Sequence, residues 1–310
     1  QRLAATGNSS FGYFGGGYNP GPLSSVDRID YNNDTATASV RGPLNISKGY
    51  MGATGNASFG YFGGGGYPSG YPSGVYPSLE STDVDRVDYS NDTATASPKG
   101  PLTVATVRRG ATGNADFGYF GGGWNGSNNI STVDRIDYSN DTATAAVKGP
   151  LSLARSGPTA TGNASFGYFG GGKGPSERTT VDRIDYSSDT GTTPAKGPLS
   201  SARAYMGATG NQSFGYFGGG NNISTVDRID YSNDTATASP KGPLSVAATY
   251  FLAATGNSSF GYFGGGYPDT SLVDRIDYSN DTADAATKGP LSQARRGSGA
   301  SSAAANANPQ

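Results

Sequence analysis

The stretch Ala-Thr-Gly-Asn-Ala-Asp-Phe-Gly-Tyr-Phe-Gly-Gly-Gly, residues 111–123, decides the fold because most of it recurs along the chain. Its last seven residues occur six times, at spacings between 46 and 58 residues. Those copies begin at Phe11, Phe59, Phe117, Phe166, Phe214 and Phe260. Each is followed by a variable loop, by Val-Asp-Arg-(Ile/Val)-Asp-Tyr, by a polar turn and by Lys/Arg-Gly-Pro-Leu. Self-similarity at a nearly fixed period indicates a repeat architecture, so the sequence predicts six structural units.

Four short strands are predicted within each unit, and the third copy illustrates them. The first strand leads up to Thr112 and ends at a Gly-Asn turn, and the second covers residues 117–120, where aromatic rings point to both faces. The third covers residues 133–138, and the fourth covers residues 142–147 before Gly-Pro stops it. Four strands in about 45 to 50 residues are typical of a β-propeller blade.

We therefore predict an all-β fold, a six-bladed β-propeller with four short antiparallel strands per blade. The predicted blades cover residues 2–48, 49–107, 108–156, 157–204, 205–250 and 251–296. Residues 297–310, rich in Ser, Ala and Asn, are predicted to form a flexible tail. An open β-solenoid is the alternative, because repeats can also stack without closing a ring.

The composition argues against several kinds of chemistry. The 310 residues include no His and no Cys, so neither a Ser-His nor a Cys-His nucleophile pair can form. Zinc, copper and iron sites nearly always use those two residues as ligands, so such sites are not expected. The net charge of −2 gives no basic surface for nucleic acid, and no apolar run approaches the roughly 18 residues that span a bilayer. We therefore expect no nucleic-acid partner and no membrane insertion.

The order of a glycine doublet, a loop, Val-Asp-Arg-Ile-Asp, a polar turn and Pro-Leu-Ser-x-Ala-Arg resembles the kelch repeat. In the third copy the matching positions are Gly121, Gly122, Asp137, Leu151 and Arg155. The units lack the Trp of the family pattern, and the Arg occurs in the third, fourth and sixth units but not in the fifth. The resemblance implies a divergent kelch-like propeller.

Two longer stretches, residues 213–220 and 225–238, are very similar to runs in kelch-like structural proteins of marine cyanobacterial phages and their uncultured relatives. That resemblance implies a virion-associated structural or tail-fibre protein, which is extracellular when the particle meets its host. Its partners would then be other virion proteins, or a glycan or protein of the host-cell surface.

An Asp-Arg pair recurs at the start of the third predicted strand in every unit. Its members are Asp27 and Arg28, Asp85 and Arg86, Asp134 and Arg135, Asp182 and Arg183, Asp227 and Arg228, and Asp274 and Arg275. Identical residues in all units indicate scaffold, so we predict Arg–Asp pairs that link strands or neighbouring blades. The alternative is a ring of carboxylates around the propeller axis that holds a cation.

The polar turns, such as residues 137–142, offer several oxygen atoms, the kind of ligand that Ca²⁺ takes. They lack the spacing of a calcium-binding loop, and Asp and Asn at tight turns usually bond to local backbone N–H groups. We therefore predict no metal site and no cofactor, with Ca²⁺ as the alternative.

The loops that follow the glycines differ from unit to unit, unlike the rest of the repeat. They span residues 18–25, 66–82, 124–132, 173–180, 221–225 and 267–272. Variable loops on a rigid scaffold commonly carry binding function, and aromatic rings beside small polar residues suit contact with a sugar or a protein. The candidate binding residues are Tyr18, Tyr67, Tyr71, Tyr76, Trp124 and Tyr267. The alternative is that these rings only cover loop backbone.

Three functions fit these observations. The first is a non-enzymatic module that presents its loops to a glycan or protein on a host surface, and the second is a decoration or spacer domain that binds only neighbouring virion proteins. The third is a glycan-active enzyme, which would need an unpaired acid or base in one unit. The acids outside the repeat pattern are Glu80, Asp83, Asp116, Glu177, Asp269 and Asp284. None of them has an evident catalytic partner, so we predict that the protein is not an enzyme and has no catalytic residues.

Overall fold

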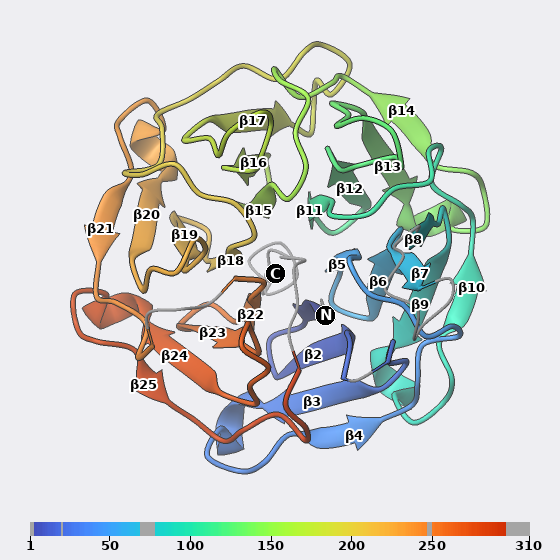
Figure 1. Ribbon diagram of the computed structural model, residues 1–310, viewed down its shortest axis with the longest axis vertical. Helices are drawn as coiled ribbons and strands as arrows, with labels where there is room; N and C mark the ends of the chain where they lie inside the picture. Colours follow the sequence, from blue (N-terminus) through green and yellow to red (C-terminus); the bar gives the residue numbers. More distant parts are fainter. Residues whose placement is uncertain (1–2, 20, 69–77, 247–249, 296–310) are drawn as a thin grey trace.

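Six small antiparallel sheets surround a central axis, as Figure 1 shows. The computed structural model describes residues 3–19, 21–68, 78–246 and 250–295, and the side chains of all of these except residues 67, 68, 78 and 79. Each sheet is one blade, so the predicted six-bladed β-propeller is confirmed. The predicted tail, residues 297–310, lies outside the described residues.

Within a blade the strands follow one another from the axis outward (Figure 1). The innermost strands are β1 (Leu3–Gly7), β5 (Gly52–Gly55), β11 (Gly110–Gly113), β15 (Thr159–Gly162), β18 (Gly207–Gly210) and β22 (Ala253–Gly256). The second strands are β2 (Phe11–Gly16), β6 (Phe59–Gly63), β12 (Phe117–Gly121), β16 (Phe166–Gly170), β19 (Phe214–Gly218) and β23 (Phe260–Gly264).

The outer half of each blade carries the Val-Asp-Arg motif and a short edge strand. The third strands are β3 (Val26–Asp30), β9 (Val84–Asp88), β13 (Val133–Asp137), β17 (Val181–Asp185), β20 (Val226–Asp230) and β24 (Val273–Asp277). The outermost strands are β4 (Ser39–Arg41), β10 (Ser97–Lys99), β14 (Ala146–Lys148), β21 (Ser239–Lys241) and β25 (Ala286–Thr287). A separate ribbon in the second blade pairs β7 (Gly66–Pro68) with β8 (Ser78–Glu80).

Every blade is made from one continuous segment of the chain. β1 belongs to the sheet β1-β2-β3-β4, and it also lies beside β22 of the sixth blade, just as the other innermost strands lie beside their neighbours. The blades therefore form a closed ring, which an open β-solenoid would not do.

Glycines in the repeated heptapeptide let neighbouring blades approach closely. A Cβ atom on Gly63 would come within 2.7 Å of the ring of Phe120 in the next blade, and a Cβ atom on Gly121 would come equally close to Phe169. Both rings are fully buried. Rings that lie on bare backbone fill the space between the sheets, which explains how a chain with few aliphatic residues forms a core.

The outermost strand is shorter than predicted. In the third copy Tyr138–Asn140 form a 3-10 turn, η3, because the Asp137 carboxylate accepts a hydrogen bond from the Ser139 N–H at 2.9 Å, and β14 begins only at Ala146. The same turn recurs as η1 (Tyr31–Asn33), η2 (Tyr89–Asn91), η4 (Tyr231–Asn233) and η5 (Tyr278–Asn280).

The fourth blade departs from the pattern, since a single bridge between Asp182 and Ala195 replaces its outermost strand. Pro194 lies beside Arg183 and accepts a hydrogen bond from the Arg183 N–H. Proline has no N–H to return a second bond, so the ladder is not completed there.

The two ends of each blade carry different kinds of connection. In the third blade, residues 122–132 and 149–158 leave one end, and we call this side of the ring, in all blades, the loop face. Residues 114–116 and 138–145 lie at the opposite end, which we call the turn face. Because the strands are antiparallel, the variable loops and the connections between blades share the loop face.

Candidate functional site

A carboxylate in the polar turn of each blade binds three side chains of the preceding blade. Asp141 is typical, because it accepts hydrogen bonds from the Tyr61 hydroxyl at 2.9 Å and Arg86 Nη1 at 2.8 Å, and it lies 3.1 Å from Lys99 Nζ. All six junctions repeat this arrangement, which we call the outer seam. Its carboxylates belong to Asp34, Asp92, Asp141, Asp189, Asp234 and Asp281.

Stacked tyrosines extend the outer seam toward the axis. Tyr61 stacks on Tyr138 of the next blade with ring centroids 4.7 Å apart, and the Tyr138 hydroxyl lies 3.1 Å from Oγ1 of Thr54. Burial raises the pKa of Tyr138, and burial together with Asp141 raises the pKa of Tyr61, in both cases well above the ordinary value of 10.0. The two phenols therefore remain protonated and keep their hydrogen bonds across the ordinary pH range.

The Asp and Arg of each recurrent Asp-Arg pair do not bond to each other. Their side chains alternate along the strand, so Arg135 reaches Asp189 of the next blade, whereas Asp134 reaches Arg109 in the connection from the preceding blade. The third strand thus links its blade to both neighbours. None of its carboxylates lines the axis, because two further strands lie between.

A buried ion pair closer to the loop face, which we call the inner seam, forms at five junctions of the described chain. In the fourth blade Asp182 lies 2.9 Å from Arg155 and also accepts the Ser152 N–H, and both charged side chains are fully buried. The pairs are Arg295–Asp27, Lys48–Asp85, Arg109–Asp134, Arg155–Asp182 and Arg203–Asp227. The Arg of the kelch-like pattern supplies three of these cations, so its place in the motif has a structural reason.

The junction between the fifth and sixth blades differs. Asp274 accepts hydrogen bonds from the Ser245 N–H at 2.9 Å and the Ser245 hydroxyl at 2.7 Å, but no described Arg or Lys pairs with it. This carboxylate therefore relies on neutral donors alone within the part of the chain that the structure describes.

Lys48 shows what burial does to such a pair. Burial lowers the pKa of Lys48, against the opposite effect of the Asp85 carboxylate 3.3 Å away. Burial likewise raises the pKa of Asp85 despite the nearby ammonium group. Loss of water outweighs the mutual attraction for both partners, so the pair contributes less to stability than its short distance suggests.

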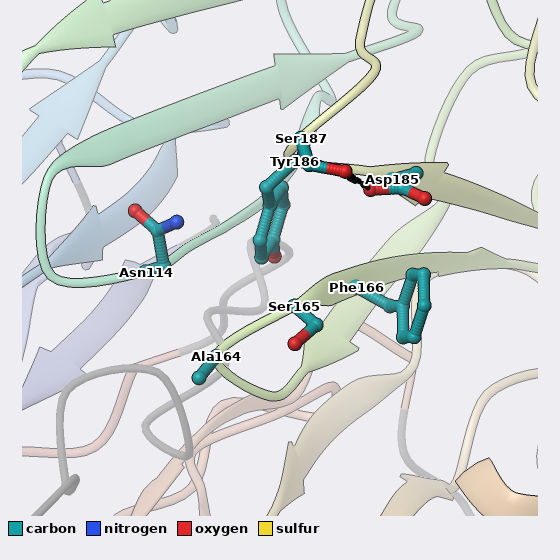
Figure 2. Close-up of a pocket in the computed structure, with 7 residues that line it drawn as sticks. All are labelled: Asn114, Ala164, Ser165, Phe166, Asp185, Tyr186 and Ser187. Carbon is teal, nitrogen blue, oxygen red and sulfur yellow. Dashed lines mark hydrogen bonds between the residues drawn. The ribbon is translucent and has the colours of Figure 1, made fainter.

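A shallow depression of about 390 Å³ lies on the turn face between the third and fourth blades, as Figure 2 shows. Asn114 comes from the third blade, whereas the other lining residues belong to the fourth blade, where they lie at the start of β16, at the end of β17 and in the turns beside those two strands. The Asp185 carboxylate already accepts the Ser187 hydroxyl at 2.7 Å. Nearly the same residue types recur in the other units, so the depression gives this junction no distinct chemistry.

On the loop face the chemistry changes from blade to blade. Five connections each place one residue with φ between 61° and 69° two positions before an innermost strand. These residues are Tyr50, Arg108, Gly157, Tyr205 and Phe251, which we call the axial ring. Each of the last four donates its N–H to the carbonyl group of the one before it, at 2.8 to 3.2 Å. The ring thus passes from blade to blade around the axis.

Gly157 leaves a gap in the axial ring, and Tyr205 fills it. A Cβ atom on Gly157 would collide with the ring of Tyr205, so that ring lies over bare glycine. Tyr205 thereby approaches Arg108, whose Cζ lies 5.9 Å from the Tyr205 centroid and 5.4 Å from the Tyr50 centroid. Tyr205 also contacts Phe251, with ring centroids 4.8 Å apart. The result is a guanidinium group flanked by two tyrosines at the axis.

Arg108 differs from the arginines of the two seams. It is half-buried and makes no ion pair or side-chain hydrogen bond with any residue that the structure describes, and its Nε atom is buried without a partner there. Its neighbour Arg109, by contrast, is buried against Asp134. Arg108 therefore keeps its donors available.

Two of the predicted binding residues lie next to the axial ring. Trp124 forms an isolated bridge with Val107, the residue before Arg108, and Tyr267 forms one with Tyr250, the residue before Phe251. Trp124 is half-buried and Tyr267 is 45% exposed. These loops therefore border the axial ring on its outer side.

The other predicted binding residues are placed less fully. Tyr18 is half-buried and bridges Pro22 within its own loop. The backbone of Tyr67 belongs to β7, and Tyr71 and Tyr76 lie outside the described residues.

The axial ring was missed by the sequence analysis. Its residues lie in the connection that follows Pro-Leu, which was treated as part of the constant repeat. A signal was present, because the position two residues before the innermost strand reads Tyr, Arg, Gly, Tyr and Phe in the second to sixth units.

Residues 3–68 without residue 20, 78–246 and 250–295 contain no cluster of three or more acidic side chains arranged to hold a metal ion. No helix in that part of the chain has the length and apolarity to cross a membrane.

A scan against protein-family models finds no match, and a search of curated proteins finds none either. The fold alone therefore defines the class, a six-bladed β-propeller whose architecture is compatible with kelch-like repeats.

Proposed function

We propose that the protein is a non-enzymatic binding module that recognises a glycan or a protein on a host-cell surface through its loop face. One contrast carries the proposal: the outer seam repeats the same groups at every junction, whereas the axial ring changes its chemistry from blade to blade. A rigid scaffold that holds aromatic and charged side chains in place reduces the entropy lost when a ligand binds.

The groups around the axis suit such a ligand. Tyr50, Tyr205 and Phe251 place aromatic rings around the axis, and Arg108 places charged N–H donors beside Tyr50 and Tyr205. Large, rigid aromatic side chains with small polar neighbours give contact area at low entropic cost.

The proposed setting is a fibre or appendage of a virus particle. This part rests on the resemblance of residues 213–220 and 225–238 to kelch-like phage structural proteins. A spacer domain that binds only neighbouring virion proteins is the alternative, and its loop face would have no affinity for cells.

The test measures adsorption of the labelled protein to a panel of cyanobacterial cells, before and after periodate oxidation of their sugars. The protein is displayed on beads, because avidity brings weak single-site binding into range. Saturable binding that periodate abolishes supports a glycan ligand, and binding that resists periodate supports a protein ligand.

A pair of variants places the binding surface. The Tyr205→Ala, Phe251→Ala variant should lose adsorption, whereas the Val40→Ala, Val147→Ala variant should keep it, because Val40 and Val147 are exposed on outermost strands. Absence of adsorption to every strain, or equal adsorption by both variants, would overturn the proposal.

A further inference from the structure

Arg108 presents a cation with which no carboxylate of the described residues pairs. The guanidinium of each outer-seam arginine bonds to a carboxylate of the next blade, as Arg86 does to Asp141. The inner-seam arginines are likewise paired, as Arg155 is to Asp182. Arg108 sits among rings instead, and a cation held at a fixed place without a counter-ion is a ready site for an anionic group.

Tyr50 and Tyr205 determine which atoms of the Arg108 guanidinium a ligand can reach. With Tyr50 and Tyr205 beside its Cζ and its Nε buried, Arg108 keeps its two Nη groups accessible to a ligand. The Nη groups form a planar fork that matches the two oxygen atoms of a carboxylate. Because Arg108 is half-buried, a charged hydrogen bond to it is less screened than one in bulk water.

We propose that the axial ring binds the carboxylate of an acidic saccharide, with Arg108 holding the anionic group and Tyr50 and Tyr205 packing against the sugar ring. The inference rests on the proposed function and names the ligand class of its site. A sugar acid joins an anion to a compact ring with polar edges, which matches a single fork beside aromatic faces and tyrosine hydroxyls. A nucleic acid would need several cations, and the chain has a net charge of −2.

Gly157 sets the width of the site. Its lack of a side chain lets Tyr205 lean toward Arg108. The Gly157→Ala variant should displace the Tyr205 ring while it leaves the guanidinium in place. We therefore expect Gly157→Ala to weaken binding of a sugar acid more than binding of a simple carboxylate.

The experiment follows the Nε–Hε resonance of Arg108 in ¹⁵N-labelled full-length protein, assigned by its loss in Arg108→Gln. The three probes are methyl β-D-glucuronide, methyl β-D-glucoside, which replaces the carboxylate with a hydroxymethyl group, and acetate, which has no ring. The glucuronide should shift this resonance saturably and bind about tenfold or more tighter than the glucoside, the range expected when one charge-assisted hydrogen bond is lost. It should also bind more tightly than acetate, which keeps the carboxylate but has no ring to pack against the tyrosines.

Variants separate the site from the rest of the face. Arg108→Gln should weaken glucuronide binding about 10- to 100-fold, as monitored by the resonances of neighbouring backbone amides. Arg178→Gln is the matched control, because Arg178 is half-buried on the same face and lies outside the axial ring. An unchanged thermal midpoint shows that Arg108→Gln folds.

Several outcomes overturn the inference. They are an Arg108 resonance that no probe moves, equal binding of glucuronide and glucoside, acetate binding as tightly as glucuronide, and an acidic peptide such as Ac-Asp-Asp-NH₂ that competes better than the sugar acid. If cells adsorb the wild-type protein and Arg108→Gln alike, the proposed function stands and this inference fails. If no cell adsorbs the protein but the glucuronide shifts Arg108, the site exists and the host-surface role fails.

Discussion

The outer seam and the axial ring lie in the same blades yet follow opposite rules. At the outer seam a Tyr, an Arg and a Lys or Arg of one blade meet an Asp of the next, and this set is the same six times. In the axial ring the five described positions hold Tyr, Arg, Gly, Tyr and Phe. Both sets of residues are linked from blade to blade, the first by side chains and the second by backbone hydrogen bonds.

This difference shows which interactions restrict the sequence. A side chain that must satisfy a buried partner cannot change unless the partner changes too, so the outer seam is uniform. A backbone hydrogen bond does not specify a side-chain partner, so the axial positions differ in residue type within the limits set by the left-handed backbone and by the Tyr205 ring over Gly157. The scaffold thus fixes where the axial side chains stand without fixing what they are.

Alkaline pH should break the seams completely, the largest effect that we expect. Twelve seam tyrosines, the two of each junction, have a pKa raised above the ordinary 10.0. A group whose pKa is raised by folding stabilises the fold below its unfolded value and loses that contribution as the pH rises above it. The protein should therefore unfold cooperatively above about pH 10. Tyrosinate absorbance and circular dichroism should change together, and gradual ionisation in a folded protein would contradict the prediction.

Two equivalent carboxylates at different junctions give the next largest contrast. Asp227→Asn leaves the buried guanidinium of Arg203 without its carboxylate partner. Removal of one partner of a buried pair lowers the free energy of unfolding by about 3 to 5 kcal/mol. Asp274→Asn leaves no described cation without a partner, so it should cost only about 1 kcal/mol, the value of a weakened hydrogen bond. Urea denaturation measures both free energies of unfolding. Equal losses would show that the inner-seam cation is not what distinguishes the junctions.

The outer seam should tolerate a similar change better than the inner seam. In Asp141→Asn the amide oxygen can still accept hydrogen bonds from Tyr61 and Arg86. Arg86 is also about a quarter exposed, so water solvates part of its charge. We expect a loss of about 2 kcal/mol by denaturant titration, because a partly solvated pair is worth less than a buried one. A loss larger than that of Asp227→Asn would reverse this order.

Substitutions in the axial ring should have the smallest effect on stability. Arg108→Gln removes no ion pair or side-chain hydrogen bond with any residue that the structure describes, so the free energy of unfolding should change by no more than about 0.5 kcal/mol. Thermal unfolding at matched pH checks this value. A loss of about 2 kcal/mol or more would place Arg108 in the scaffold and remove the contrast between ring and seam.

Repetition made the number of blades and their order readable from the sequence. It could not identify partners across a junction, because identical copies offer identical choices. Arg135 has Asp134, Asp137 and Asp141 nearby in its own unit, yet it binds Asp189 of the next one. The packing of one sheet on the next determines which of these carboxylates Arg135 binds.

The inner seam shows a second limit. The cation at this seam does not always come from the same position of the repeat. The third unit supplies Arg155, but the second unit has Thr106 at the matching position, and Arg109 pairs with the Asp134 carboxylate instead. The axial ring was hidden for a related reason. Its importance depends on closeness to the axis and on a left-handed backbone, and neither property is visible in one residue type.

Because every blade is one continuous segment and carries matching halves of the outer seam on its two sides, any unit can stand beside any other. Recombination between nearly identical stretches of the coding sequence would then exchange a whole blade and keep the outer-seam contacts on both of its sides. Each exchange would bring in a new axial residue and a new loop together. Under the proposed function, the ligand preference of the loop face would then change by whole units rather than by single residues.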